Sequence, residues 1–144
     1  MTTDLTDRRR LEISLLALRA GVLIVMLMWT LDKLIHPEHA AAVFENFYGL
    51  SGLGSGALAL MGIAELVLLA LFAAGVWKRV TYGLVLVFHG VSTLSSYQQY
   101  LDPFNHLLFF AAWPMLAACL ALYLLRDQDR MLTWGRLRGQ HEAG

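Results

Sequence analysis

Residues 56–77 read GALALMGIAELVLLALFAAGVW, an unbroken apolar stretch in which Glu65 is the only charged residue. An α-helix rises about 1.5 Å per residue and needs about 20 residues to cross the hydrocarbon core of a bilayer. This stretch therefore predicts a transmembrane helix. Three further apolar stretches of similar length lie at residues 13–35, 80–97 and 104–125.

The composition of the whole chain also indicates a membrane protein. Hydrophobic residues make up 58% of the 144 residues, against about 45–50% in ordinary soluble domains. Charged residues make up only 15%, against about 25%. A soluble domain of this size has too little interior to bury so much apolar side chain. We therefore expect an all-α integral membrane protein, an antiparallel four-helix bundle whose main partner is the lipid bilayer.

Charge balance and cysteine content exclude several function classes. Eleven Lys and Arg residues balance eleven Asp and Glu residues, so the net charge gives no indication of a nucleic-acid partner. The single cysteine, Cys119, excludes an internal disulfide, a Cys-x-x-Cys redox centre and a cysteine-based zinc site.

The links between the apolar stretches predict how the helices are connected. Residues 77–79 and 98–103 are short links, which make consecutive helices antiparallel neighbours. The link at residues 36–55 is longer, and its Pro37 suits the first position of a helix. Its apolar residues share one face, which predicts a short interfacial helix between the first two spans, ended by the glycines of residues 49–54.

Basic residues indicate the orientation. Lys33 is the only basic residue on the side of the first link, and the opposite side carries nine, namely Arg8, Arg9, Arg10, Lys78, Arg79, Arg126, Arg130, Arg136 and Arg138. Lys and Arg accumulate on the cytoplasmic side of membranes, so both termini are expected in the cytoplasm of a bacterium, with the protein in the inner membrane.

This orientation gives three regions. Residues 1–12 are a cytoplasmic N-terminal segment, residues 13–125 a four-span membrane domain, and residues 126–144 a basic cytoplasmic tail. Two interpretations of the tail stay open, since its arginines and Trp134 suit contact with the inner leaflet and equally suit a frayed, solvated end.

Charged residues inside the predicted spans are candidate functional residues, because a charge at the membrane centre costs at least about 2.5–3.5 kcal/mol. Counted from the cytoplasmic ends, Arg19 lies about 10 Å deep, His89 about 15 Å and Glu65 about 19 Å. These depths predict a Glu65–His89 contact with Arg19 nearby. The cluster suits a proton-handling or quinone site, and it equally suits a structural ion pair. A third interpretation is a Glu65 that is protonated and hydrogen-bonded.

A second polar group is expected at the outer face, comprising Asp32, Lys33, His36, His39, Asp102, Asn105 and His106. His36, His39 and His106 are candidate metal ligands, although they form no compact ligand motif. Lys33, Asn105 and His106 are also candidate ligand-binding residues.

Trp113 is a further candidate, because beside Pro114 it either lines a cavity or fills the kink that the proline makes. Haem is not expected between His89 and His106, whose heights differ by about 15 Å. Haem bound by His89 and another subunit stays open.

Three short motifs carry a family resemblance. They are LRAG at residues 18–21, DKL at 32–34 followed by Pro37, and GIAEL at 62–66 followed by Gly75 and Arg79. The pattern resembles the DoxX-like membrane proteins, small four-helix proteins with an Arg early in span one, a Lys–Pro exit from it and a Glu in span two. The resemblance covers about residues 15–125.

The resemblance implies a link to redox chemistry. The relatives that gave the family its name are linked to thiosulfate:quinone oxidoreduction, and others look like accessory subunits of redox complexes or maturation factors. Arg19, Lys33 and Glu65 match family-type positions, whereas His89 and His106 rest on depth alone. One branch acts in disulfide maturation, but the single Cys119 argues against thiol catalysis by this chain.

Three function classes follow. The leading one is a membrane subunit associated with quinone-linked redox chemistry, with quinone as the expected ligand. The rival is a non-catalytic assembly factor or structural subunit, bound to other membrane subunits or to copies of itself. The third is a small-solute carrier, weakened because the sequence lacks paired broken helices. Whether the chain is an enzyme stays open.

Overall fold

The computed structural model describes residues 2–135, with side chains from Leu5 onward, and all regular structure in this range is helical. The elements in chain order are α1 (Thr2–Ile35), α2 (Pro37–Tyr48), α3 (Ser55–Ala73), α4 (Lys78–Ser95), α5 (Tyr97–Leu101), η1 (Pro103–Asn105), η2 (Leu107–Ala111) and α6 (Ala112–Leu124). The prediction of an all-α chain is confirmed for the described residues.

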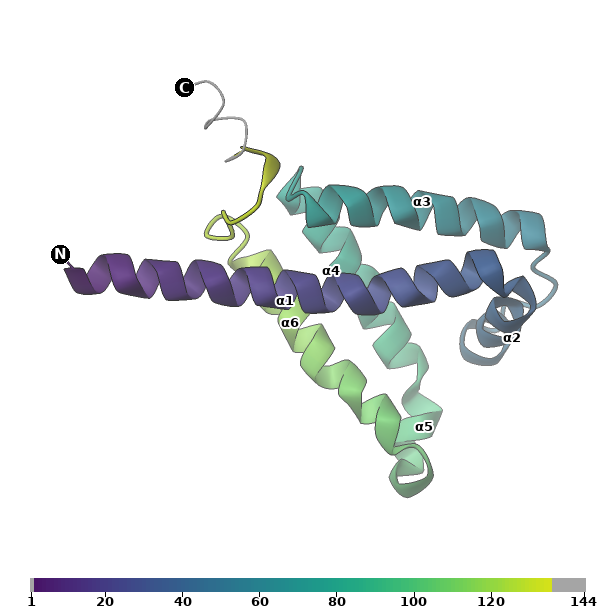
Figure 1. Cartoon of the computed structure of the whole chain (residues 1–144). Helices are drawn as coiled ribbons and strands as arrows, with labels where there is room; N and C mark the ends of the chain where they lie inside the picture. The colour runs from purple at the N-terminus through teal and green to yellow at the C-terminus, as the bar shows by residue number, and fades with distance from the viewer. Residues whose placement is uncertain (1, 136–144) are drawn as a thin grey trace.

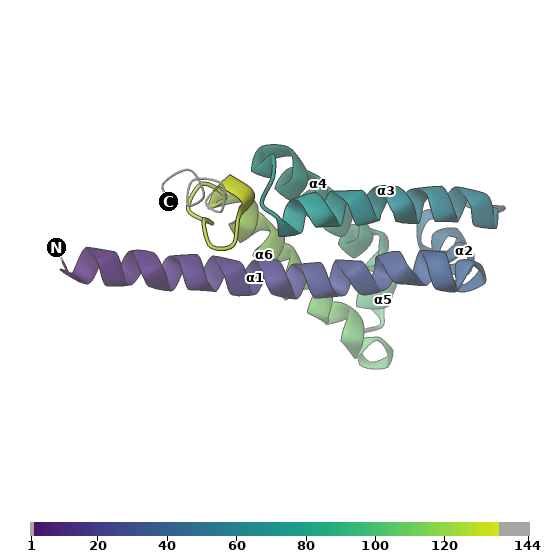
Figure 2. The ribbon, with the colours of Figure 1, turned by 45° about the horizontal axis from the view of Figure 1, so that its top comes forward.

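The four longest helices form two pairs that cross (Figures 1 and 2). α1 packs along α3, and α4 packs along α6. The pairs converge where the α3–α4 turn, the end of α6 and the middle of α1 meet, and they diverge toward α2 and α5 (Figure 1). We call the converging end, which also holds both ends of the described chain, the basic end, after Arg8–Arg10, Lys78, Arg79, Arg126 and Arg130.

Three helical segments are long and apolar enough to cross a membrane: Leu5–Ile35, Ser55–Ala73 and Leu107–Leu124. Most of their side chains are not buried inside the protein. The stretch at residues 80–97 forms α4 as expected, but α4 is not among these apolar segments, because the helix is only 18 residues long and its charged first residues, Lys78 and Arg79, together with His89 lower its mean hydropathy. A fourth span therefore stays a prediction.

Two helices differ in extent from the sequence prediction. α1 begins at Thr2 instead of near residue 13, because arginine, leucine and glutamate in this region favour a helix. Residues 2–12 therefore continue α1. The stretch at residues 104–125 is not one α-helix, since α6 starts only at Ala112 and the preceding turns are the 3₁₀ segments η1 and η2.

α2 confirms the predicted helix in the first link. It starts with Pro37 at its first position and ends at Gly49, whose φ of 67° is readily adopted only by glycine. Its Phe47 ring stacks on Phe109 of η2, with the ring centroids 5.8 Å apart. α2 thus joins the diverging ends of the two helix pairs.

The hydrophobic core lies at the basic end. The rings of Phe72 from α3 and Tyr82 from α4 meet edge to face, with centroids 4.8 Å apart. Around them all four long helices contribute buried side chains, namely Leu15, Val22, Leu69, Val85, Cys119 and Leu122. This core fixes the crossing point of the two helix pairs.

Gly75 forms the turn between α3 and α4. Its φ is 62°, and its N–H donates to the Phe72 carbonyl while the Val76 N–H donates to the Leu71 carbonyl. These two bonds satisfy carbonyl groups at the end of α3. A Cβ on Gly75 would lie 2.7 Å from Cγ2 of Thr133. Both the backbone angle and the close approach of the C-terminal segment therefore require glycine here.

We expect Gly75→Ala to lower the free energy of unfolding by about 2 kcal/mol, because it adds left-handed strain and a clash with Thr133. Thermal unfolding of the detergent-purified protein measures this. The control is Gly21→Ala, since a Cβ on Gly21 of α1 meets nothing within 4 Å. A Gly75→Ala protein that melts no lower than the control contradicts the role of the turn.

Candidate functional site

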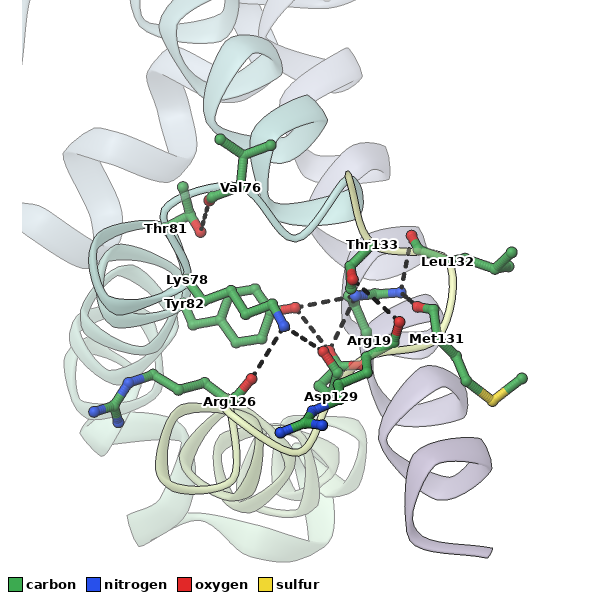
Figure 3. A network of polar contacts seen from close by, with 11 residues as sticks. Arg19, Val76, Lys78, Thr81, Tyr82, Arg126, Asp129, Met131, Leu132 and Thr133 are labelled. Atoms are coloured by element: carbon green, nitrogen blue, oxygen red, sulfur yellow. Dashed lines mark hydrogen bonds and ion pairs between the residues drawn. The ribbon is translucent and has the colours of Figure 1, made fainter. Parts of the chain in front are cut away.

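A buried arginine occupies the basic end. Arg19 of α1 is 2% exposed, and its Nη1 donates to the Tyr82 hydroxyl at 3.1 Å and to Oδ2 of Asp129 at 3.0 Å. The Tyr82 hydroxyl donates to the same Oδ2 at 2.7 Å (Figure 3). Because a buried charge is costly unless it is paired and hydrogen-bonded, these three side chains compensate one another.

The same arginine holds the C-terminal segment against the helices. Its Nη2 donates to the carbonyls of Met131 at 2.5 Å and Leu132 at 3.5 Å. The N–H of Trp134 donates to the carbonyl of Ala74 at 2.8 Å. Residues 126–135 therefore pack on the protein, and the expectation of a frayed tail is wrong for them. Residues 136–144 lie outside the described residues, and contact with a leaflet stays a prediction.

Lys78, the first residue of α4, adds a second link to this segment. Its Nζ donates to the carbonyl of Arg126 at 3.2 Å and to the carbonyl of Asp129. Burial lowers the pKa of Lys78 below its ordinary value, while the Asp129 carboxylate opposes that shift. The cation thus lies in the protein surface instead of extending into solvent.

A second ion pair joins α1 to α3 near α2. Nζ of Lys33 lies 2.9 Å from Oε2 of Glu65, and the hydroxyl of Thr30 donates to the same oxygen at 2.9 Å. Nζ of Lys33 also lies 6.0 Å from the centre of the Phe44 ring of α2. Glu65 therefore points toward α1, in a polar group built from three helices.

The two ion pairs differ in accessibility. The side chains of Arg19 and Asp129 are 3% and 0% exposed, whereas those of Lys33 and Glu65 are 13% and 20% exposed. The Arg19 group is closed, with its partners supplied by the chain itself. The Lys33–Glu65 pair is open enough for a small group to approach its charged atoms, so it is the stronger candidate for binding or proton transfer.

His89 belongs to neither group. Its Nε2 lies 3.0 Å from the carbonyl oxygen of Ala112 and 3.4 Å from the hydroxyl of Thr93. Because Ala112 starts α6, the imidazole links α4 to α6. The predicted cluster of Glu65, His89 and Arg19 is not brought together by the structure. Depth alone does not determine which face of a helix a side chain occupies, and Glu65 faces α1 while His89 faces α6.

Of the polar residues expected at the outer face, Lys33 pairs with Glu65, and the others form two separate groups. Asp32 accepts a hydrogen bond from Nδ1 of His39 at 2.7 Å and lies 3.5 Å from Nδ1 of His36. Asn105 donates to Asp102, whose backbone carbonyl lies 3.1 Å from Nδ1 of His106. Within residues 2–135, no three His, Cys, Asp or Glu residues form a group that could hold a metal ion. The predicted set of His36, His39 and His106 is thus not assembled.

Trp113 does not occupy a mid-helix kink. Pro114 is the third residue of α6, where its missing N–H and fixed φ are tolerated. The Trp113 ring lies 5.6 Å from that of Tyr100 and is about half exposed. Trp113 still lies within the apolar segment Leu107–Leu124, but it neither fills nor flanks a kink, because the proline stands in the first turn of α6.

Three residues of these groups were not predicted from the sequence: Thr30, Tyr82 and Asp129. Thr30 lies one turn after Met26 and three residues before Lys33. Helical spacing alone therefore predicts that Thr30 and Lys33 share one face of α1. Nothing in the sequence distinguishes Asp129 from the neighbouring Asp127.

Comparison of the chain with protein-family models, curated proteins and solved structures found no match.

We expect Asp129→Ala to lower the free energy of unfolding by about 3–5 kcal/mol, because it leaves the Arg19 guanidinium buried without its counter-charge. The measurement is thermal unfolding together with limited proteolysis of residues 126–135, which should become cleavable. Asp127→Ala is the matched control, since Asp127 is exposed, and it should change little. Equal effects of the two substitutions would contradict a central role for the Arg19–Asp129 pair.

Proposed function

We propose that this chain is a multi-pass protein of a bacterial inner membrane that takes part in quinone-linked redox chemistry through the Lys33–Glu65 pair. The three long apolar segments support the membrane placement. Large apolar side chains on α3, namely Leu60, Ile63 and Val67, are turned outward, which suits lipid better than water.

α4 serves as the fourth span of an antiparallel bundle in this proposal. Its polar residues do not argue against it, because Thr81 and Thr93 are buried within the protein. The Thr81 hydroxyl donates to the carbonyl of Val76 at 3.0 Å, and the Thr93 hydroxyl to the carbonyl of His89 at 2.8 Å. Hydroxyl groups satisfied in this way are compatible with a bilayer.

Both termini are expected in the cytoplasm, since Lys33 is the only Lys or Arg of the described residues that lies away from the basic end. A reporter fused to the C-terminus measures this. We expect activity from a cytoplasmic reporter and none from a periplasmic one. The reverse pattern would overturn the orientation.

The observation that supports the site is the incomplete burial of Lys33 and Glu65 among apolar helices. The residues suit a quinone head group. The Lys33 ammonium would donate a hydrogen bond to a carbonyl oxygen, and the Phe44 ring beside it offers an apolar contact. Glu65 already accepts from Lys33 and Thr30, so a change in its protonation would be coupled to both.

Quinone reduction takes up two electrons and two protons. In this proposal the electrons come from a redox partner protein. The role that falls to this chain is to bind and orient the ligand and to pass the two protons, one after the other, through the Glu65 carboxylate. The resemblance to DoxX-like proteins implies the link to quinone chemistry and matches Glu65 to a family-type position.

The test measures binding of a short-chain quinone to Glu65→Gln and wild-type protein in the same detergent. Quinone turnover is measured after each protein is expressed in membranes that lack the native copy, where the redox partner supplies the electrons. The amide keeps the shape and part of the hydrogen bonding but cannot exchange a proton. We expect at least a hundredfold loss of quinone-linked turnover with an unchanged melting temperature, in line with the usual contribution of acid–base catalysis, about 10²–10⁴-fold.

The matched control is Glu45→Gln on the exposed side of α2, which should leave turnover and binding unchanged. If the wild-type protein neither binds nor turns over quinone, and Glu65→Gln only lowers the melting temperature, the pair is structural and the proposal fails.

A non-catalytic membrane subunit is the second candidate. The observation that favours it is an apolar surface at the far end of the α4–α6 pair, where Leu101, Phe104 and Leu108 are almost fully exposed. Such a surface suits a neighbouring subunit or a second copy of the chain. Stable association that is lost in Leu108→Ser, with no quinone binding, would favour this alternative.

A further inference from the structure

We propose that the basic end carries a binding site for the phosphate of an anionic phospholipid, between the α3–α4 turn and the end of α6. A shallow groove of about 520 Å³ lies there, lined by residues that include Trp77, Lys78, Arg79, Val80, Arg126 and Asp127. The inference uses the membrane orientation of the proposed function but none of its quinone chemistry.

Charge favours an anionic ligand in this groove. Three cationic residues, Lys78, Arg79 and Arg126, face one carboxylate, Asp127. Lys78 lines the groove with its Nζ engaged by the carbonyls of Arg126 and Asp129, so the free cationic donors are those of Arg79 and Arg126. A basic pocket at the cytoplasmic surface of membrane helices is the type of site that binds lipid head groups.

Arg79 and Arg126 both have guanidinium N–H donors that bind no acceptor among the described residues. Arg79 is exposed and makes no hydrogen bond or ion pair with the described residues. The guanidinium of Arg126 packs over the Tyr123 ring, 4.9 Å from its centre, and donates one hydrogen bond to the Tyr123 carbonyl. Its guanidinium points away from the Asp129 carboxylate (Figure 3). Since a guanidinium has five N–H donors, most of those on Arg126 remain for a phosphate.

Trp77 fixes the depth of the site. Its φ is 45°, a left-handed angle that is unusual for a bulky residue, and its side chain is 72% exposed. The turn thus presents an indole at the edge of the groove. Tryptophan favours the interface between hydrocarbon and head groups, so the neighbouring arginines would lie at the level of the lipid phosphates.

A track for acyl chains distinguishes a lipid from a free phosphate. Val80 lines the groove, and Val80, Leu84, Val87 and Val91 are all exposed on α4. Their spacing of four, three and four residues places them on one helix face. On α6, Leu120 and Leu124 are exposed as well. The apolar strip leads from the cationic groove toward the middle of the helices, as a bound phospholipid requires.

The test measures binding of labelled phosphatidylglycerol, relative to phosphatidylcholine, to the purified full-length protein in phosphatidylcholine nanodiscs. We expect a preference for the anionic lipid, reduced about fivefold by Arg79→Gln and by Arg126→Gln, as the loss of one cation near a membrane surface predicts. The melting temperature without the anionic lipid should stay unchanged, because neither arginine side chain carries a buried ion pair.

Arg9→Gln is the matched control, an exposed arginine of α1 at the same end but outside the groove. It should leave the preference intact. Equal losses in all three variants would mean general surface attraction and would overturn the site. Displacement of the lipid by inorganic phosphate at millimolar concentration would assign the groove to a free anion instead. A protein that binds no quinone but keeps this lipid preference would contradict only the proposed function.

Discussion

The structure depends on the need to neutralise a guanidinium inside a protein. Arg19 has almost no contact with solvent, and its donors are satisfied by a carboxylate, a phenol and two backbone carbonyls. These acceptors come from α4 and from the C-terminal segment, so the charge can be compensated only when α1, α4 and that segment are together. The hydrophobic core surrounds this group, and the convergence of the helix pairs follows from both.

α1 carries two cations with opposite environments. Arg19 and Lys33 are separated by about 21 Å of helical rise, one at the converging end and one where the helix pairs diverge. Convergence encloses the first with protein on all sides. Divergence leaves the second with a single carboxylate, one backbone carbonyl of its own helix and an aromatic ring, and with part of its side chain exposed. The crossing geometry therefore separates an enclosed ion pair from one that is partly exposed.

The sequence predicted where most of the helices lie, but it predicted few of the contacts in the candidate site. Long apolar stretches located α1 and α3, and Pro37 with Gly49 delimited α2, because these signals act locally. The predicted contact between Glu65 and His89 was wrong, because position along an apolar stretch gives the depth of a residue but not its rotation about the helix axis. The role of Asp129 could not be predicted from the sequence, for a different reason. Asp127 and Asp129 have the same chemistry, and only the path of the chain after α6 determines which carboxylate is enclosed.

The Arg19–Asp129 pair joins residues 110 positions apart, which has a consequence for how the protein is made. During synthesis Arg19 leaves the ribosome long before its counter-ion exists. α1 therefore carries an uncompensated cation until the C-terminal segment has been made, since Asp129 supplies the carboxylate that pairs with Arg19. Completion of the basic end is thus a late event in synthesis, and a chain that ends before residue 129 keeps a guanidinium without its counter-charge.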